Sequence, residues 1–137
     1  MNRNFEIGLL ITRLVLGIIF FVHGFVKFRD GIGNVSGWFD SIGIPGFAAY
    51  IVAIIELVGG LALIIGFGTR IVSILLAIVM VGAMFKVKLA IGFLGNGQMA
   101  GYELDLALLA IALLLGLSGS RLLALDRALL GSRSAAN

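Results

Sequence analysis

Residues 5–28 read FEIGLLITRLVLGIIFFVHGFVKF, an almost unbroken apolar run. A helix needs about 20 mainly apolar residues to cross the hydrocarbon core of a bilayer, so this run is long enough to span a membrane. It continues past Arg13 to Lys27 without a small-residue cleavage site of the A-x-A kind, which argues against a signal peptide. We therefore expect a retained first membrane helix.

Three further segments are predicted to cross the membrane, namely residues 46–67, 70–89 and 102–117. Helices are the expected spanning form, because lipid offers no hydrogen-bond partner to an open sheet edge. Only a short turn joins the second and third segments, so these two must form an antiparallel hairpin. The glycine-rich first loop contains Trp38, which suits the membrane interface, and we expect a short amphipathic helix there over residues 35–41.

The predicted fold class is an all-α polytopic membrane protein, an antiparallel four-transmembrane-helix bundle with that short interfacial helix in its first loop. One domain is expected to cover residues 1–130, followed by a disordered tail over residues 131–137. The composition agrees with this class, because 61% of the 137 residues are hydrophobic, against roughly 45–50% in soluble proteins. A soluble domain this short could not bury that much apolar side chain.

Residue counts exclude or disfavour several kinds of site. The chain has no cysteine, which rules out a disulfide framework, a thiol nucleophile and iron–sulfur ligation by its own residues. Its single histidine rules out a bis-histidine haem site within one chain, and no metal or nucleotide site is expected. The net charge of +3 is spread thinly between apolar runs, so membrane lipid and not nucleic acid is the expected partner.

Four ionisable residues fall inside the first two predicted spans: Arg13, His23, Lys27 and Glu56. Such groups are costly at membrane depth, so each is a candidate functional residue. If the two helices are antiparallel neighbours, Arg13 and Glu56 reach similar depths and are predicted to pair. The alternative is that this pair only fixes helix register. His23 has the alternative role of a hydrogen bond to a neighbouring helix, and Lys27 that of an interfacial anchor.

Two further features accompany these charges. Glycines share a helix face with them and are predicted to let the first two helices approach closely; they are Gly17, Gly24, Gly59 and Gly60. The fourth predicted span carries Glu103 and Asp105 in its first turn, where carboxylates complement the helix dipole. Beside cations, the same carboxylates could also bind a polar ligand.

Several stretches are similar to one known family. They are RLVLGIIFFVHGFVKF (13–28), ELVGGLALIIGFGTR (56–70), GYELDLALLA (101–110) and SGSRLLALD (118–126). In this order they resemble the DoxX family over nearly the whole chain, with Ser120 where the family commonly has proline. The resemblance implies a four-helix membrane protein, with relatives that include a subunit of a thiosulfate:quinone oxidoreductase and proteins linked to quinone, catechol or oxidative-stress resistance. The matching family positions are Arg13, His23, Gly24, Lys27, Glu56, Gly59, Gly60 and Arg70.

The leading functional hypothesis is a quinone-linked redox component of the plasma membrane, with menaquinone or ubiquinone as ligand. Glu56 and His23 are the predicted catalytic residues, acting as a proton relay. The predicted ligand-binding residues are Arg13, His23, Lys27, Glu56 and Glu103. Because the chain lacks redox groups of its own, electrons would have to come from a soluble or membrane oxidoreductase partner.

Two alternatives stay open, and enzymatic activity itself is not decided by the sequence. The first is a non-enzymatic anchor or assembly subunit that docks a soluble oxidoreductase through the glycine-rich loops and Trp38. The second is a small transporter or lipid-like ligand carrier, which would need a homo-oligomer to provide enough helices. The distribution of basic residues favours cytoplasmic termini by a narrow margin.

Overall fold

The computed structural model describes residues 2–89, 91–98 and 101–129. The elements that it assigns to these residues are all helical: α1 (Arg3–Arg29), α2 (Ile32–Ser41), α3 (Phe47–Ile65), α4 (Thr69–Ala83), the π-helix η1 (Met84–Lys88) and α5 (Glu103–Ser118). The predicted all-α class is confirmed, and a short helix is present in the first loop. The predicted tail over residues 131–137 lies outside the described residues.

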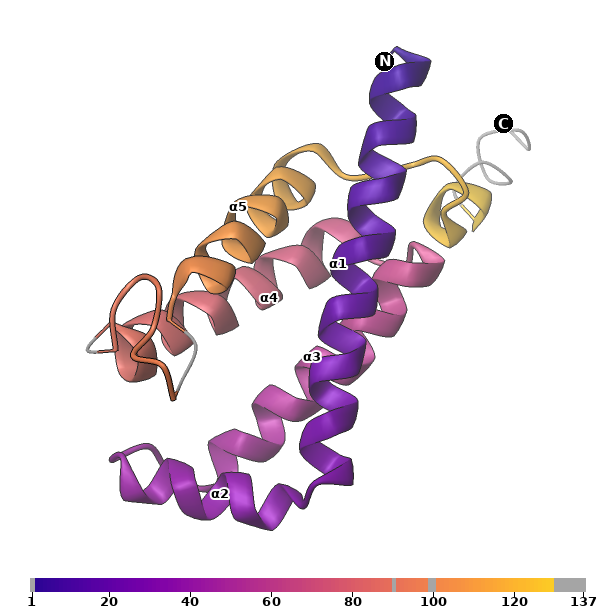
Figure 1. Cartoon of the computed structure of the whole chain (residues 1–137). Coiled ribbons are helices and arrows are strands. Elements are labelled where there is room, and N and C mark those ends of the chain that lie inside the picture. The colour runs from indigo at the N-terminus through magenta and orange to yellow at the C-terminus, as the bar shows by residue number, and fades with distance from the viewer. Residues whose placement is uncertain (1, 90, 99–100, 130–137) are drawn as a thin grey trace.

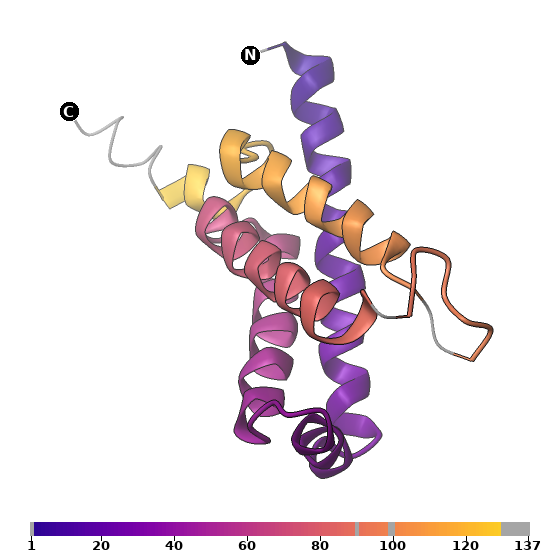
Figure 2. The same cartoon turned by 90° about the vertical axis from the view of Figure 1, so that its left-hand side faces the viewer.

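The helices are arranged as two packed pairs. α1 lies along α3, and α4 lies beside α5, which is steeply inclined to α1 (Figure 1). A quarter turn of the molecule shows the same two pairs, with α2 at the end of α1 that is far from the N-terminus (Figure 2). Large buried side chains fill the space where the pairs meet, among them Leu16, Phe20, Leu63, Leu76, Leu108 and Leu115. The two helix pairs therefore contact each other through this core.

Glycine sets the close approach of α1 to α3. A Cβ atom on Gly17 would lie 2.8 Å from the carbonyl oxygen of Gly60, and one on Gly24 would lie 2.9 Å from that of Ala53. No side chain larger than hydrogen fits at these two positions, which is how small residues bring membrane helices together. In this register the Arg13 side chain reaches Gly66, just after α3, and Glu56 lies opposite Gly24 of α1.

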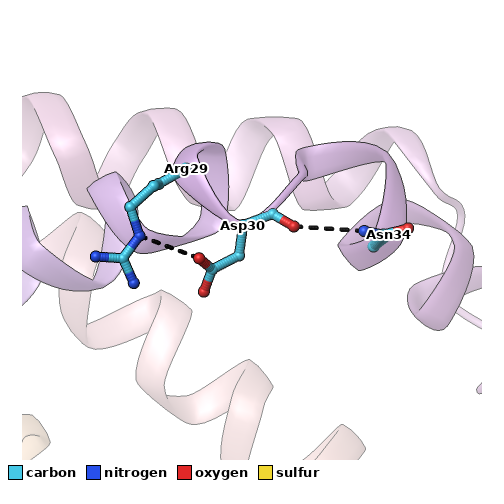
Figure 3. Close-up of polar contacts among 3 residues, drawn as sticks. All are labelled: Arg29, Asp30 and Asn34. Atoms are coloured by element: carbon cyan, nitrogen blue, oxygen red, sulfur yellow. Dashed lines mark hydrogen bonds and ion pairs between the residues drawn. The ribbon is translucent and has the colours of Figure 1, made fainter.

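A sharp corner connects α1 to α2 at residues 29–34. Arg29 donates from Nε to Oδ1 of Asp30 at 3.1 Å, and the side-chain amide of Asn34 donates to the Asp30 carbonyl at 3.4 Å (Figure 3). Gly31 adopts a positive φ of 104° between them. The corner folds α2 back against α3, where none of the α2 residues is fully buried.

Three helical segments among the described residues are long and apolar enough to cross a membrane. They are Arg3–Arg29, Phe47–Ile65 and Thr69–Lys88, with mean hydropathies of 2.2, 2.4 and 2.2. Large apolar side chains point away from the core on these segments, as at Ile71, Ile78 and Phe85, which are 63–70% exposed. α5 has 16 residues, or about 24 Å of helix, which is shorter than the roughly 30 Å hydrocarbon core. A fourth crossing by α5 therefore stays a prediction.

Candidate functional site

A cavity of about 570 Å³ opens between the α1–α3 pair and the α4–α5 pair. Its walls come from the second halves of α1 and α4, from α2, from the first half of α3, and from the start of α5. We call it the interhelical pocket. Most of its lining is apolar, including Trp38, Phe39, Ile44, Ile51, Ile55, Val79 and Met80. A largely apolar cavity with a few convergent polar groups is the usual form of a small-molecule site.

One ion pair stands on the α1–α3 side of the pocket. Lys27 Nζ donates to Glu56 Oε2 at 2.6 Å. The Glu56 side chain is only 4% exposed, whereas that of Lys27 is 25% exposed and extends toward the pocket from the last turns of α1. The pair lets both groups stay charged where an isolated charge would be costly.

A second ion pair stands on the α4–α5 side. Lys88 Nζ lies 3.0 Å from Asp105 Oδ2, with side chains 24% and 7% exposed. The distance is that of an ion pair, but the geometry leaves Asp105 Oδ2 buried without a hydrogen bond. Lys88 is placed by the π-helix η1, and such wide turns are frequent at functional sites. Asp105 lies in the first turn of α5, which presents it to the same pocket.

His23 lines the pocket together with these two pairs. Its imidazole is partly buried and meets Phe20 edge-on, with ring centroids 6.4 Å apart. The ring forms no hydrogen bond to any residue in the described part of the chain, so both nitrogens are available to a ligand. His23, two ammonium groups and two carboxylates thus line one cavity, which provides both donors and acceptors.

The sequence matches the profile of the DoxX family over residues 8–89, more than half of the chain. The chain belongs to the DoxX family. Membrane helices and family membership together make it a membrane protein, as the first segment predicts.

Three curated proteins are similar to this DoxX chain. "Putative oxidoreductase CatD" of Bacillus subtilis (strain 168) is 48% identical over 126 residues, which cover 92% of this chain and 90% of that protein. The uncharacterized membrane protein Rv3486 of Mycobacterium tuberculosis is 36% identical, covering 85% and 78%. The inner membrane protein YqjF of Escherichia coli (strain K12) is 33% identical, covering 51% and 53%. No solved structure is significantly similar to the chain.

The predicted pairing of Arg13 with Glu56 is wrong for this DoxX protein. Arg13 is fully buried and donates instead to the carbonyl oxygens of Ser120, Leu122 and Leu123 at 3.1–3.2 Å. The helix register is the reason, because Glu56 lies opposite Gly24, eleven residues or about 16 Å along α1 from Arg13. The flexible Lys27 side chain reaches Glu56 from the other direction. Arg13 therefore lies outside the pocket and fastens residues 119–124 to the helices.

Some of the other predicted residues of the DoxX chain line the interhelical pocket, and others lie at contacts between helices. His23, Lys27 and Glu56 line the pocket, as a shared site requires. Glu103 is exposed and is not among the pocket-lining residues, so a ligand contact from it stays a prediction. Gly17, Gly24 and Gly60 lie at the α1–α3 contact, whereas Gly59 faces Val72 and Leu76 of α4.

The sequence predicts for Asp105 an interaction with the helix dipole or with a polar ligand beside cations, but it does not predict the pairing of Asp105 with Lys88 in the pocket. A usable signal was present, because Lys88 lies at the end of the third predicted span and Asp105 at the start of the fourth, so both lie at the same end of neighbouring spans. Facing charges at the ends of neighbouring spans are candidates for one site.

Proposed function

We propose that this protein is a quinone-linked component of a membrane oxidoreductase system that handles quinones or oxidative stress, in the plasma membrane and with menaquinone or ubiquinone as ligand. The observation that carries the proposal is the interhelical pocket, in which His23, Lys27–Glu56 and Lys88–Asp105 meet between apolar walls. The name of the Bacillus subtilis relative places that protein among the oxidoreductases and supports the same reaction class.

The residues present fit a quinone head group. Such a ring is flat and apolar with two carbonyl oxygens, and it needs a hydrogen-bond donor at each end. His23 and the two lysine ammonium groups are donors that line the pocket. Asp105 Oδ2 lies 3.0 Å from the Lys88 ammonium group without a hydrogen bond of good geometry, and it could accept one from a protonated ligand oxygen. The aromatic and branched side chains of the walls suit the ring faces.

When bound, a quinone accepts two electrons and two protons on reduction. The chain's own part is to orient the ring and to hold protons near its oxygens. Lys27 and Glu56, 2.6 Å apart, form one path for a proton from the side of the α1–α2 corner. His23 takes or gives a proton through either ring nitrogen, because neither is committed to a described residue. The electrons come from a partner oxidoreductase.

Fluorescence of Trp38 tests the proposal directly. It is the chain's single tryptophan and it lines the pocket. Titrating the purified protein with a soluble short-chain quinone should quench its emission along a saturating curve, and His23→Phe should weaken the binding by about tenfold. N-acetyltryptophanamide controls for quenching in solution. Linear quenching that matches this control would remove the support for a quinone site.

A specific observation also favours the anchor function. α2 has no fully buried residue, and Trp38, which lines the pocket, and Ile42, which follows α2, are 40% and 38% exposed. A soluble oxidoreductase docked on α2 would stand next to the site that it supplies with electrons. Photo-crosslinkers placed at residues 37 and 41 in native membranes should then capture one dominant partner. Capture of lipid alone would exclude docking at α2.

A further inference from the structure

A second cavity, of about 700 Å³, lies at the opposite end of α4 from the interhelical pocket. Its walls are the turn between α3 and α4, the first residues of α4, and residues 118–121 and 126–127, which follow α5 and fold back over the helices. We call it the terminal cavity. None of its residues belongs to the proposed quinone site, so its function is a separate question.

The lining of the terminal cavity carries an excess of positive charge. Three arginines contribute to it, Arg70, Arg121 and Arg127, against one carboxylate, that of Asp126. Asp126 Oδ2 already accepts the backbone N–H of Gly68 at 2.6 Å, and Arg70 donates from Nη2 to the Ser118 carbonyl at 3.2 Å. Arg121 and Arg127 make neither an ion pair nor a side-chain hydrogen bond within the described residues.

The start of α4 adds two features that suit an anion. The first backbone N–H groups of a helix lack partners within that helix, and the helix dipole favours negative charge beside them. Independently, the side chain of Thr69 is buried in the wall of this cavity, 4% exposed, and its hydroxyl has no hydrogen-bond partner among the residues that the structure describes. Buried hydroxyl groups are nearly always satisfied, and a ligand oxygen in the cavity would provide a partner for this one.

We propose that the terminal cavity binds a phosphate group, with Arg121 and Arg127 as ligands and the Thr69 hydroxyl as an additional hydrogen-bond donor. The position of the cavity favours the phosphodiester of an anionic phospholipid as the source. The spanning segments of α3 and α4 end at Ile65 and begin at Thr69, so the turn between them lies at headgroup depth. Ile71, 70% exposed beside the cavity, is placed to contact an acyl chain.

Native mass spectrometry of the full-length protein in neutral detergent tests this proposal. The protein is titrated with phosphatidylglycerol and, in parallel, with phosphatidylcholine. We expect binding of phosphatidylglycerol to exceed that of phosphatidylcholine, and the double variant Arg121→Gln/Arg127→Gln to weaken it by about tenfold. The matched control Arg3→Gln/Arg29→Gln removes two exposed charges elsewhere and should change binding by less than about twofold.

Two further arms sharpen the result. Thr69→Val keeps the side-chain shape and all charges, and it should also weaken binding of phosphatidylglycerol, which charge attraction alone would not predict. Inorganic phosphate that displaces the lipid at millimolar concentration would assign the cavity to free phosphate, whereas no displacement assigns it to the lipid headgroup. Equal losses in the two double variants, or equal binding of the two lipids, would overturn the proposal.

Discussion

Lys27 of α1 and Glu56 of α3 form a 2.6 Å ion pair in which the carboxylate is nearly inaccessible and the ammonium group is one-quarter exposed. The two partners therefore depend on each other to different degrees. A lysine can extend its long side chain toward water when its partner is lost, whereas the glutamate is held at the centre of α3. The pair also connects the close-packed α1–α3 contact to the wall of the interhelical pocket.

This asymmetry predicts that Lys27→Met is more destabilising than Glu56→Gln. Lys27→Met leaves a buried carboxylate without a partner and should cost about 3–5 kcal/mol. Glu56→Gln leaves a lysine that reaches solvent and should cost about 1–2 kcal/mol. Thermal unfolding in detergent would rank the two variants. Equal losses of stability in the two variants would mean that an unpaired Lys27 side chain reaches solvent no more easily than an unpaired Glu56 side chain does.

The glycine contacts predict a sharp contrast between two adjacent residues. A Cβ atom on Gly60 would lie 2.6 Å from the Gly17 carbonyl oxygen, so Gly60→Ala must push the backbones of α1 and α3 apart. A Cβ atom on Gly59 would meet a Val72 methyl group at 3.3 Å, which a side-chain adjustment can relieve. We expect Gly60→Ala to cost about 2–3 kcal/mol and Gly59→Ala less than about 1 kcal/mol. Thermal unfolding in one detergent compares them, and similar stabilities would contradict the described register.

Arg13 is predicted to secure the segment that follows α5 and to leave the pocket unaffected. Arg13→Met removes the donor to three carbonyl oxygens and should release residues 119–124. Limited proteolysis should then cleave after residue 118 several-fold faster than in the wild type, with Arg3→Gln as a control at an exposed arginine. If proteolysis is unchanged and quinone quenching of Trp38 is lost, Arg13 serves the ligand instead.

Asp105 and Glu103 provide a matched pair for the α5 side of the pocket. Asp105 is buried beside Lys88, whereas Glu103, two residues earlier, is exposed and outside the lining. Asp105→Asn should weaken quinone quenching of Trp38 by about tenfold, and Glu103→Gln should leave it unchanged. The reverse order would restore the role that the sequence assigns to Glu103.

The sequence predicts helix type and position well because long apolar runs can form only helices in lipid. All four predicted segments are helices in the structure, and the glycines mark the face on which α1 meets α3. The sequence does not predict which charged side chains pair with each other, because pairing depends on the register between the helices. Arg13 and Glu56 have suitable charges at similar estimated depths, yet the observed register separates them by about three helical turns, and Glu56 pairs with Lys27. The role of Ser120 and its neighbours as acceptors for Arg13 depends on a chain reversal that no local pattern indicates.

The central claim, that the interhelical pocket holds a quinone, is tested most directly by what the protein carries out of its native membrane. Wild type, Glu56→Gln and Glu103→Gln would be purified in mild detergent, and their extracted small molecules quantified by mass spectrometry. The account predicts close to one quinone per chain in wild type and Glu103→Gln, and a large depletion in Glu56→Gln. Quinone absent from all three samples, or equal in all three, would contradict it.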